Sequence, residues 1–205
     1  MNIDNLRKNI LKRSFYTQDT FVCLKESLGK ILVHEEGKNT TAGRIVEVEA
    51  YIGGEDKGSH AYQNRRTKRT EIQFNDGGYA YVYRSHMYDL LNFVTEEKDI
   101  PKVILIRALE PLYGLDIMKE RRGKDDVISL TNGPGKLSQA MNITKELYGH
   151  DMTKSNSKLF LIDDGFKIND EDIVKTARIG IDYAEDYKDV PWRWYLKDSM
   201  FVSRR

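Results

Sequence analysis

The strongest chemical pattern in this chain is RIVEVEAYIGG at residues 44–54. Its two-residue period predicts a β-strand whose apolar face carries Val46, Val48, Ala50 and Ile52. The opposite face of the same strand carries Ile45, Glu47, Glu49 and Tyr51. Carboxylates are costly to bury unless they have a partner or a chemical role. The acidic face is therefore where we expect a general base.

Glu49 is the leading candidate for this base, because a carboxylate in an apolar-walled cleft can hold and deprotonate a water molecule. The alternative is a structural carboxylate that pairs with an arginine. Glu47 lies one pleat away on the same face. It is either the base itself or an ion-pair partner.

Two further candidates follow in the sequence. Arg107 comes directly after the apolar run at residues 103–106, which predicts a buried strand that ends there. An arginine in such a place must meet an anion or a carbonyl, so it either holds Glu49 or contacts a phosphate. His60 follows a glycine-rich bend, where it either donates a hydrogen bond to a ligand or ties down the loop.

Tyrosines could supply a binding surface for a planar ring. Tyr79, Tyr81 and Tyr83 alternate along a second expected strand, and Tyr51 belongs to the first. Stacking a base on an aromatic side chain is worth roughly 1–3 kcal/mol. The alternative is an ordinary half-buried sheet face, where tyrosine is favoured in any case.

Basic side chains are clustered although the net charge is only +1. The clusters are residues 65–69 (RRTKR), residues 121–124 (RRGK) and Arg204-Arg205. Each is either part of a local basic face or a solvated loop. The segment NGPGK, which ends at Lys136, precedes an expected helix whose first N–H groups favour an anion such as a DNA phosphate. A plain turn is the alternative, and the spacing is not that of a P-loop.

The composition predicts a globular protein. The 205 residues suit a single domain over 1–205, with 40% hydrophobic and 32% charged residues. Cys23 is the only cysteine, and no metal-ligand spacing occurs, so we expect neither a disulfide nor a metal or other cofactor. The sequence shows no leader segment and no membrane-length apolar run, so we expect a cytoplasmic protein without membrane contact.

Helix and strand patterns are mixed along the chain, which predicts an α+β fold with a largely antiparallel sheet. Helices are expected at residues 17–30, capped by Asp19 or Thr20, then from Pro111 onward, and after Gly135. Beyond those described, strands are expected to begin at Leu32-Val33 and to cover residues 159–162, 179–181 and 192–195.

A series of segments resembles the alkyladenine DNA glycosylase family, the methylpurine type of 3-methyladenine DNA glycosylase. In order they are VEVEAYIGGEDKGSHAY, GYAYVY, NFVT, VILIRALEPLYG, NGPGKLSQAMNI, ARIGI and PWRWY. The resemblance extends from about Phe15 to Ser203. It implies a single compact domain with a curved antiparallel sheet flanked by helices, and a protruding β-hairpin that contacts DNA.

By this resemblance the protein flips alkylated or deaminated purines, of the 3-methyladenine, 7-methylguanine and hypoxanthine class, out of duplex DNA. It hydrolyses the N-glycosidic bond and acts as a monomer in base excision repair, nucleoid-associated if the source is a bacterium. Glu49 matches the general base, and Arg107 matches the arginine that positions the water. The base-binding positions match Tyr51, His60, Tyr83 and Asn92. DNA contacts are expected from Arg65, Arg66, Arg69, His86, Met87 and Lys136.

No lysine falls on the Glu49 face, so we expect a hydrolase without lyase activity. Two departures from the family pattern affect base flipping. The hairpin lacks the usual wedge tyrosine, and His86 or Met87 is the substitute that we nominate. The basic loop has Lys68 and Thr70 where the family tends to have proline and asparagine.

Two alternatives therefore stay open. The first is a non-catalytic or weakly catalytic protein that binds DNA lesions with a degenerate hairpin. The second is a hydrolase of free nucleosides or a small-molecule transferase on a similar fold.

Overall fold

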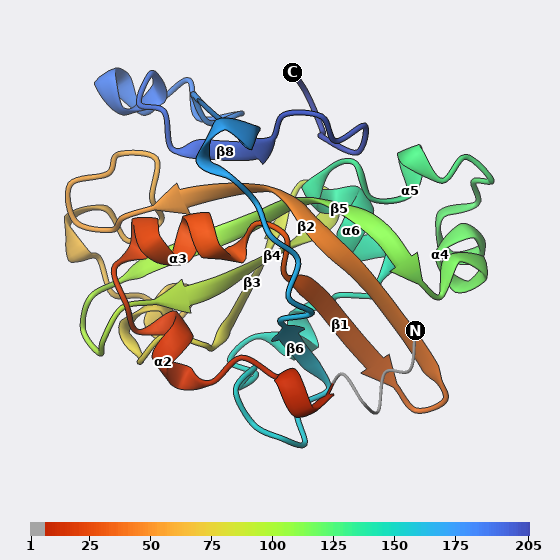
Figure 1. Cartoon of the computed structure of the whole chain (residues 1–205). Helices are drawn as coiled ribbons and strands as arrows, with labels where there is room; N and C mark the ends of the chain where they lie inside the picture. The colour runs from red at the N-terminus through yellow and green to blue at the C-terminus, as the bar shows by residue number, and fades with distance from the viewer. Residues whose placement is uncertain (1–6) are drawn as a thin grey trace.

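The computed structural model describes residues 7–205 and is built around one antiparallel sheet (Figure 1). The strands are β1 (Ile31–Glu36), β2 (Asn39–Tyr51), β3 (Ala80–Ser85), β4 (Tyr88–Thr95), β5 (Lys102–Tyr113), β6 (Leu159–Ile162), β7 (Ile173–Thr176) and β8 (Arg193–Leu196). Their order is β3-β4-β5-β2-β1-β6, with β8 also paired to β2 and β7 paired to β8. This arrangement confirms the α+β prediction. The long strand β2 thus pairs with three others.

The helices in the described range are α2 (Arg13–Tyr16), α3 (Thr20–Ser27), α4 (Leu115–Arg122), α5 (Ile128–Thr131) and α6 (Pro134–Ala140). Short 3₁₀ turns occur along the rest of the described chain: η1 (Arg7–Asn9), η2 (Tyr62–Asn64), η3 (Glu71–Phe74), η4 (Lys145–Leu147), η5 (Asp170–Asp172) and η6 (Glu185–Lys188). The side chain of Asp19 accepts hydrogen bonds from the first N–H groups of α3, which confirms the expected cap on a shorter helix. None of these helices is long and apolar enough to cross a membrane.

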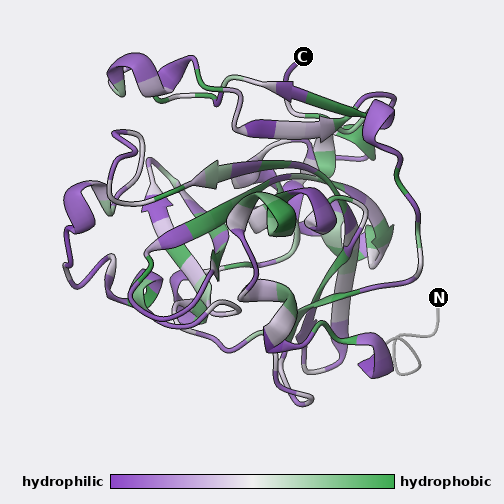
Figure 2. Ribbon diagram, turned by 60° about the vertical axis from the view of Figure 1, so that its left-hand side comes forward, coloured by the Kyte–Doolittle hydropathy of each residue, from purple (hydrophilic) through white to green (hydrophobic). Residues whose placement is uncertain are grey.

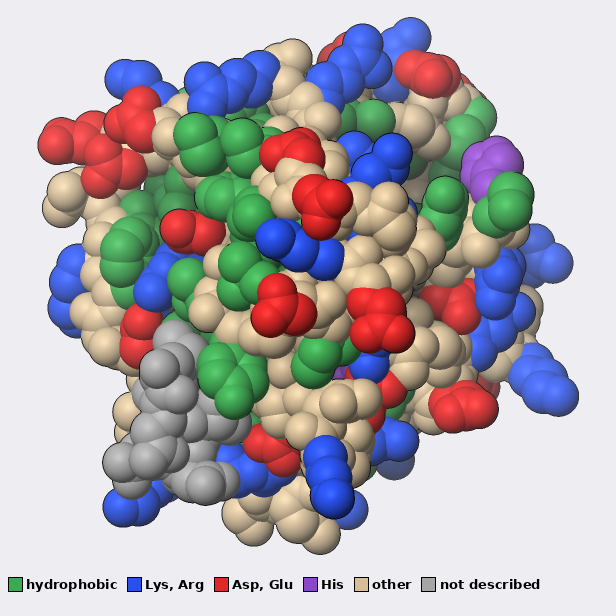
Figure 3. Space-filling model, turned by 90° about the vertical axis from the view of Figure 1, so that its right-hand side faces the viewer, with side chains coloured by type: hydrophobic (Ala, Val, Ile, Leu, Met, Phe, Trp, Pro, Cys, Tyr) green, Lys and Arg blue, Asp and Glu red, His purple; other side chains and the backbone are tan. Residues whose placement is uncertain are grey.

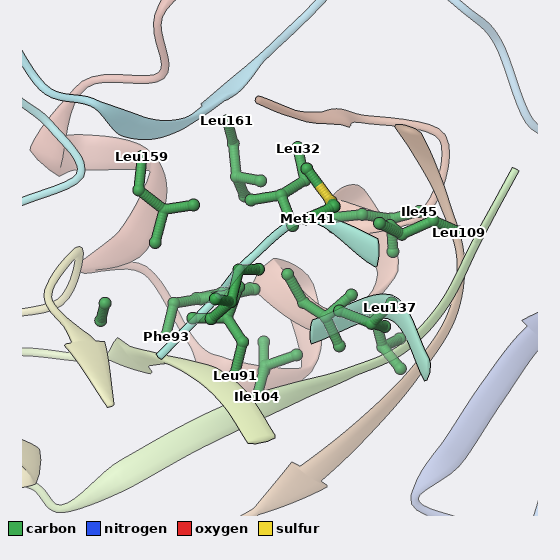
Figure 4. Packing of buried hydrophobic residues seen from close by; sticks show 14 of the residues in the cluster. Leu32, Ile45, Leu91, Phe93, Ile104, Leu109, Leu137, Met141, Leu159 and Leu161 are labelled. Carbon is green, nitrogen blue, oxygen red and sulfur yellow. The ribbon is translucent and has the colours of Figure 1, made fainter. Parts of the chain in front are cut away.

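A single large apolar cluster joins the sheet to the helices. Figure 4 shows side chains from β1, β2, β4, β5, β6 and the α6 region that point toward one another: Leu32, Ile45, Leu91, Phe93, Ile104, Leu109, Leu137, Met141, Leu159 and Leu161. The hydropathy colouring agrees, because the hydrophobic residues concentrate in the central strands and the hydrophilic ones in the outer turns (Figure 2). This packing fixes the strands that carry the candidate site.

Paired irregularities in β2 and β5 change the expected alternation. Ile45 pairs with Leu109 and Glu47 with Ala108, which leaves Val46 as an extra residue in β2. A bulge of this kind shifts the facing of a strand by one residue. Ile45 therefore belongs to the buried core with Val48, and its expected place on the acidic face was wrong.

Three other expectations are also wrong. Pro111 does not begin a helix but lies inside β5, and α4 begins only after Gly114, which has a φ of 75°. Because β5 continues to Tyr113, Arg107 lies in the middle of a strand rather than at its end. Residues 179–181 form no strand, whereas β7, which the sequence pattern did not suggest, lies just before them.

The β3–β4 hairpin closes with a two-residue turn between Ser85 and Tyr88. His86 in this turn has a φ of 51°, and the adjacent Met87 is 80% exposed. At the start of β4, directly after the turn, the ring of Tyr88 lies against Gly135, where a Cβ atom would come within 2.7 Å of the ring. The side chain of Met87 is thus free, while the adjacent start of β4 is held against α6.

Candidate active site

A cavity of about 450 Å³ lies between the β3–β4 hairpin, the end of β2, β5 and the segment after β7. Its lining includes Tyr51, His60, Arg69, Gln73, Tyr81, Tyr83, Asn92, Arg107, Ile179 and Tyr183. The structure thus brings together eight candidates from distant parts of the sequence, namely Tyr51, His60, Arg69, Tyr81, Tyr83, His86, Asn92 and Arg107. Aromatic rings on several sides make this cavity suitable for a planar ligand.

Glu49 is completely buried directly behind the cavity wall, against the lining residues Tyr51, Arg107 and Ile179. Its Oε1 accepts a hydrogen bond from the backbone N–H of Ile179 at 2.8 Å and lies 3.1 Å from Nη1 of Arg107. Its Oε2 accepts a hydrogen bond from the hydroxyl of Tyr51 at 2.8 Å. An ionised carboxylate offers about four acceptor positions. One position on Oε2 therefore stays available for a water molecule.

Glu47 has a different environment, although it is also completely buried. It accepts hydrogen bonds from Arg107 Nε at 2.9 Å and Arg193 Nη1 at 2.8 Å. Ser203 donates from its backbone N–H at 2.6 Å and from its hydroxyl at 2.8 Å. Burial acts to raise the pKa of Glu47, but the charge of Arg107 and these hydrogen bonds outweigh it and lower the pKa. Glu47 is thus the ion-pair partner rather than an available base.

Arg107 connects the two carboxylates. Its Nε donates to Glu47, and its Nη1 faces Glu49. Burial acts to lower its pKa, yet the charges of Glu49 and Glu47 raise it overall, so the guanidinium stays charged. The planar fork of an arginine suits this bridging role, which fixes the orientation of both carboxylates.

Tyr51 is held from behind by Arg178, a residue that the sequence reasoning missed. The Arg178 guanidinium lies 4.6 Å from the centre of the Tyr51 ring and forms a buried ion pair with Asp56 at 2.5 and 2.7 Å. Burial and the Glu49 charge raise the pKa of Tyr51 well above its usual value, so its hydroxyl remains a donor. In the sequence, only the motif ARIGI at residues 177–181 pointed to this segment. We expected a strand there, so the turn that places Arg178 against Tyr51 was not predicted.

His60 and two tyrosines form the opposite wall. The Tyr81 and Tyr83 rings stack with centroids 5.4 Å apart, and the His60 ring stands edge-on to Tyr83 at 4.5 Å. Arg69 donates to Nε2 of His60 at 3.0 Å, and Nδ1 of His60 lies 2.8 Å from the Tyr81 hydroxyl. Burial and then Arg69 lower the pKa of His60 to about 4. His60 is therefore neutral near pH 7 and ties its loop to β3.

Of two further candidates, Tyr79 lies outside the cavity and Asn92 lies in its wall. Tyr79 does not line the cavity but lies under the guanidinium of Arg13, 4.7 Å from its ring centre. Asn92 in β4 is buried in the cavity wall, where its amide donates to the backbone oxygen of Tyr81 at 3.2 Å. The wall position of Asn92 is thus fixed by the sheet itself.

The expected DNA-binding residues differ in how they are held. Arg65 is exposed, whereas Arg66 pairs with Asp99 at 2.5 Å and covers the ring of Phe74. Arg69 turns toward His60 and Tyr83, as described above. Lys136 donates to the side chain of Asn132 at 2.8 Å. The face in Figure 3 shows basic and acidic side chains interspersed rather than one large basic surface.

The site thus combines an arginine-held carboxylate with an aromatic cavity, which suits hydrolysis of a bond to a planar base. The sequence model of the methylpurine-DNA glycosylase family matches residues 14–200, and this chain belongs to that family. A relative in Clostridium novyi (strain NT) is 47% identical over 204 residues, covering 95% of this chain and 98% of the relative. A relative in Methanoculleus marisnigri is 45% identical over 196 residues, covering 95% and 99%. Both carry the name "Putative 3-methyladenine DNA glycosylase".

Proposed function

We propose that this protein is a DNA glycosylase that flips alkylated or deaminated purines out of duplex DNA and hydrolyses their N-glycosidic bond. The observation that carries the proposal is the environment of Glu49. Its carboxylate is buried, is held by Arg107 and Ile179, and keeps one acceptor position on Oε2. This geometry suits a base that accepts a proton from an attacking water.

In the proposed reaction, the damaged purine enters the cavity and stacks against Tyr83 and His60. Water held by Glu49 attacks the sugar carbon C1′, the C1′–N bond breaks, and its electron pair leaves with the purine. An alkylated purine that carries a positive charge is already a good leaving group, so its release requires little acid catalysis. The cavity lining contains no lysine, which supports hydrolysis without a Schiff-base lyase step.

The β3–β4 hairpin is the element that we assign to base flipping. Extrusion of a base costs a few kcal/mol, and an inserted side chain can fill the resulting gap. Met87 is 80% exposed at the tip and has a flexible side chain, whereas His86 belongs to the cavity lining, which favours Met87 as the inserted group.

A lesion-binding protein is the second candidate function. It is favoured by the hairpin turn of His86 and Met87, which carries no tyrosine wedge. Such a protein would bind damaged duplexes without releasing the base.

The deciding experiment measures base release from duplexes that contain hypoxanthine or 3-methyladenine. Glu49→Gln is expected to lower release by at least about 100-fold while duplex binding persists, because a general base contributes roughly 10²–10⁴-fold. Glu110→Gln is a matched control, since this carboxylate lies on β5 outside the cavity. Equal release by wild type and Glu49→Gln contradicts the assignment. Lesion binding without release by the wild type selects the second candidate.

A further inference from the structure

Gln73 is a buried polar residue of the cavity wall to which no role has been assigned above. It lies in η3, its residue surface is only 1% exposed, and it lines the same cavity as His60 and Tyr81. Within residues 7–205, neither its amide oxygen nor its amide nitrogen has a hydrogen-bond partner. Buried amides are nearly always paired in native structures. An unpaired amide in the wall of a cavity therefore indicates a group that a ligand completes.

The hydrogen bonds beside Gln73 show which donor groups this part of the cavity wall leaves free for a ligand. Because Arg69 donates to Nε2 of His60, the proton of the neutral imidazole lies on Nδ1 and is donated to the Tyr81 oxygen. The hydroxyl hydrogen of Tyr81 is then left to donate elsewhere. Burial raises the pKa of Tyr81 to about 12. The adjacent Gln73 amide acts to lower this pKa, although it does not reach hydrogen-bond geometry with the Tyr81 hydroxyl.

We propose that Gln73 determines specificity by pairing with the substituent at position 6 of the flipped purine, an inference that rests on the proposed function. The ring faces of Tyr83 and His60 contact any purine equally well, because every base has a π-face. Position 6 carries an amino donor in adenine and an oxygen acceptor in guanine or hypoxanthine. A carboxamide serves both, since it presents its oxygen to an amino group or, when rotated, its NH₂ to an oxo group.

Two substitutions of Gln73 separate these roles. Gln73→Met keeps the length of the side chain but removes its hydrogen-bonding groups. It is expected to lower single-turnover release of both 3-methyladenine and hypoxanthine about three- to tenfold, the range for one neutral hydrogen bond. Gln73→Glu keeps the size but, when ionised, only accepts hydrogen bonds. It is expected to impair release of 6-oxo hypoxanthine more than release of 6-amino 3-methyladenine.

A purine that lacks a substituent at position 6 is the substrate control. Gln73→Met should leave the affinity for a duplex containing this base unchanged, while it weakens binding of the two 6-substituted bases. Gln63→Met is the protein control, because Gln63 is an exposed residue of η2. Melting temperatures of all variants establish that they are folded.

Equal losses on all three bases would indicate a packing role for Gln73 and overturn the inference, as would the absence of any change. A wild-type protein that releases no base contradicts the proposed function instead. The duplex affinities still decide the role of Gln73 in that case. A loss confined to 6-substituted bases supports the role, and a uniform loss or none rejects it.

Discussion

Glu47 and Glu49 show how two carboxylates on one strand face acquire different roles. Glu47 accepts four hydrogen bonds from Arg107, Arg193 and Ser203, three of them on Oε1 and one on Oε2. Glu49 keeps an acceptor position beside the cavity. The residue pattern placed both on the acidic face with Glu49 as the leading candidate, and only the resemblance to the glycosylase family matched Glu49 to the base, because the distinguishing donors come from residues far along the chain.

Replacing Glu47 by glutamine is expected to destabilise the fold by about 3 kcal/mol, because it leaves the buried Arg193 without its carboxylate partner and Arg107 with Glu49 alone. The same substitution should change the pH dependence of stability. The folded-state pKa of Glu47 is lower than its usual 4.5, so its contribution is complete above pH 4.5 and is lost as pH falls through the lower folded value. Urea unfolding at several pH values measures both effects, with Glu110→Gln as the control.

His60 is expected to titrate with a pKa of about 4, and NMR of its ring resonances measures this value. Burial is the larger cause and the positive charge of Arg69 the second. Arg69→Gln should therefore raise the pKa of His60 but leave it below 6.5. Because the folded pKa is lowered, the contribution of neutral His60 to stability is complete above pH 6.5 and declines as pH falls toward 4. A pKa near 6.5 in the wild type contradicts this account.

Strands and helices were predicted from sequence where the local pattern and the tertiary environment agree. The β3 alternation, β6 and the Asp19 cap of α3 are examples, because each is set by neighbouring residues. The paired bulge at Val46 was not predictable, since it depends on the register with β5. Gln73 was overlooked for a similar reason. Nothing in its local sequence distinguishes a cavity wall from an exposed loop.

Contact between α6 and the hairpin gives a prediction at the level of elements. Gly→Ala inside a helix normally stabilises a protein by roughly 0.5–1 kcal/mol. At Gly135 the new methyl group would lie 2.7 Å from the Tyr88 ring, so Gly135→Ala should instead destabilise the fold or displace the hairpin. Thermal unfolding and duplex affinity detect the two effects. Adding Tyr88→Ala should relieve only the clash with the ring, because the Cβ atom of residue 88 would still lie 2.9 Å away. A stabilised Gly135→Ala single variant would disprove the contact.

At the scale of the whole molecule, the site depends on the chain beyond β8. Ser203 donates twice to Glu47, and the backbone oxygen of Arg204 accepts from Arg193. A chain shortened to end at Val202 is expected to lose at least about 6 °C in melting temperature, since each of the two hydrogen bonds to the buried charge is worth about 1.5–3 kcal/mol. Arg205→Ala is the control, because its guanidinium contacts only the backbone oxygen of Ser199. An unchanged melting temperature of the shortened chain contradicts this dependence.

The contacts of Glu47 and Glu49 on β2 also determine when the site can form during protein synthesis. Glu47 and Glu49 leave the ribosome early, but their donors Ile179, Arg193 and Ser203 belong to the last 27 residues of the 205-residue sequence. Chains are synthesised at about 5–20 residues per second, so both carboxylates stay without these partners for several seconds. The nascent protein must keep this acidic strand hydrated until then. The proposed catalytic site therefore forms only after the chain has been synthesised beyond Ser203.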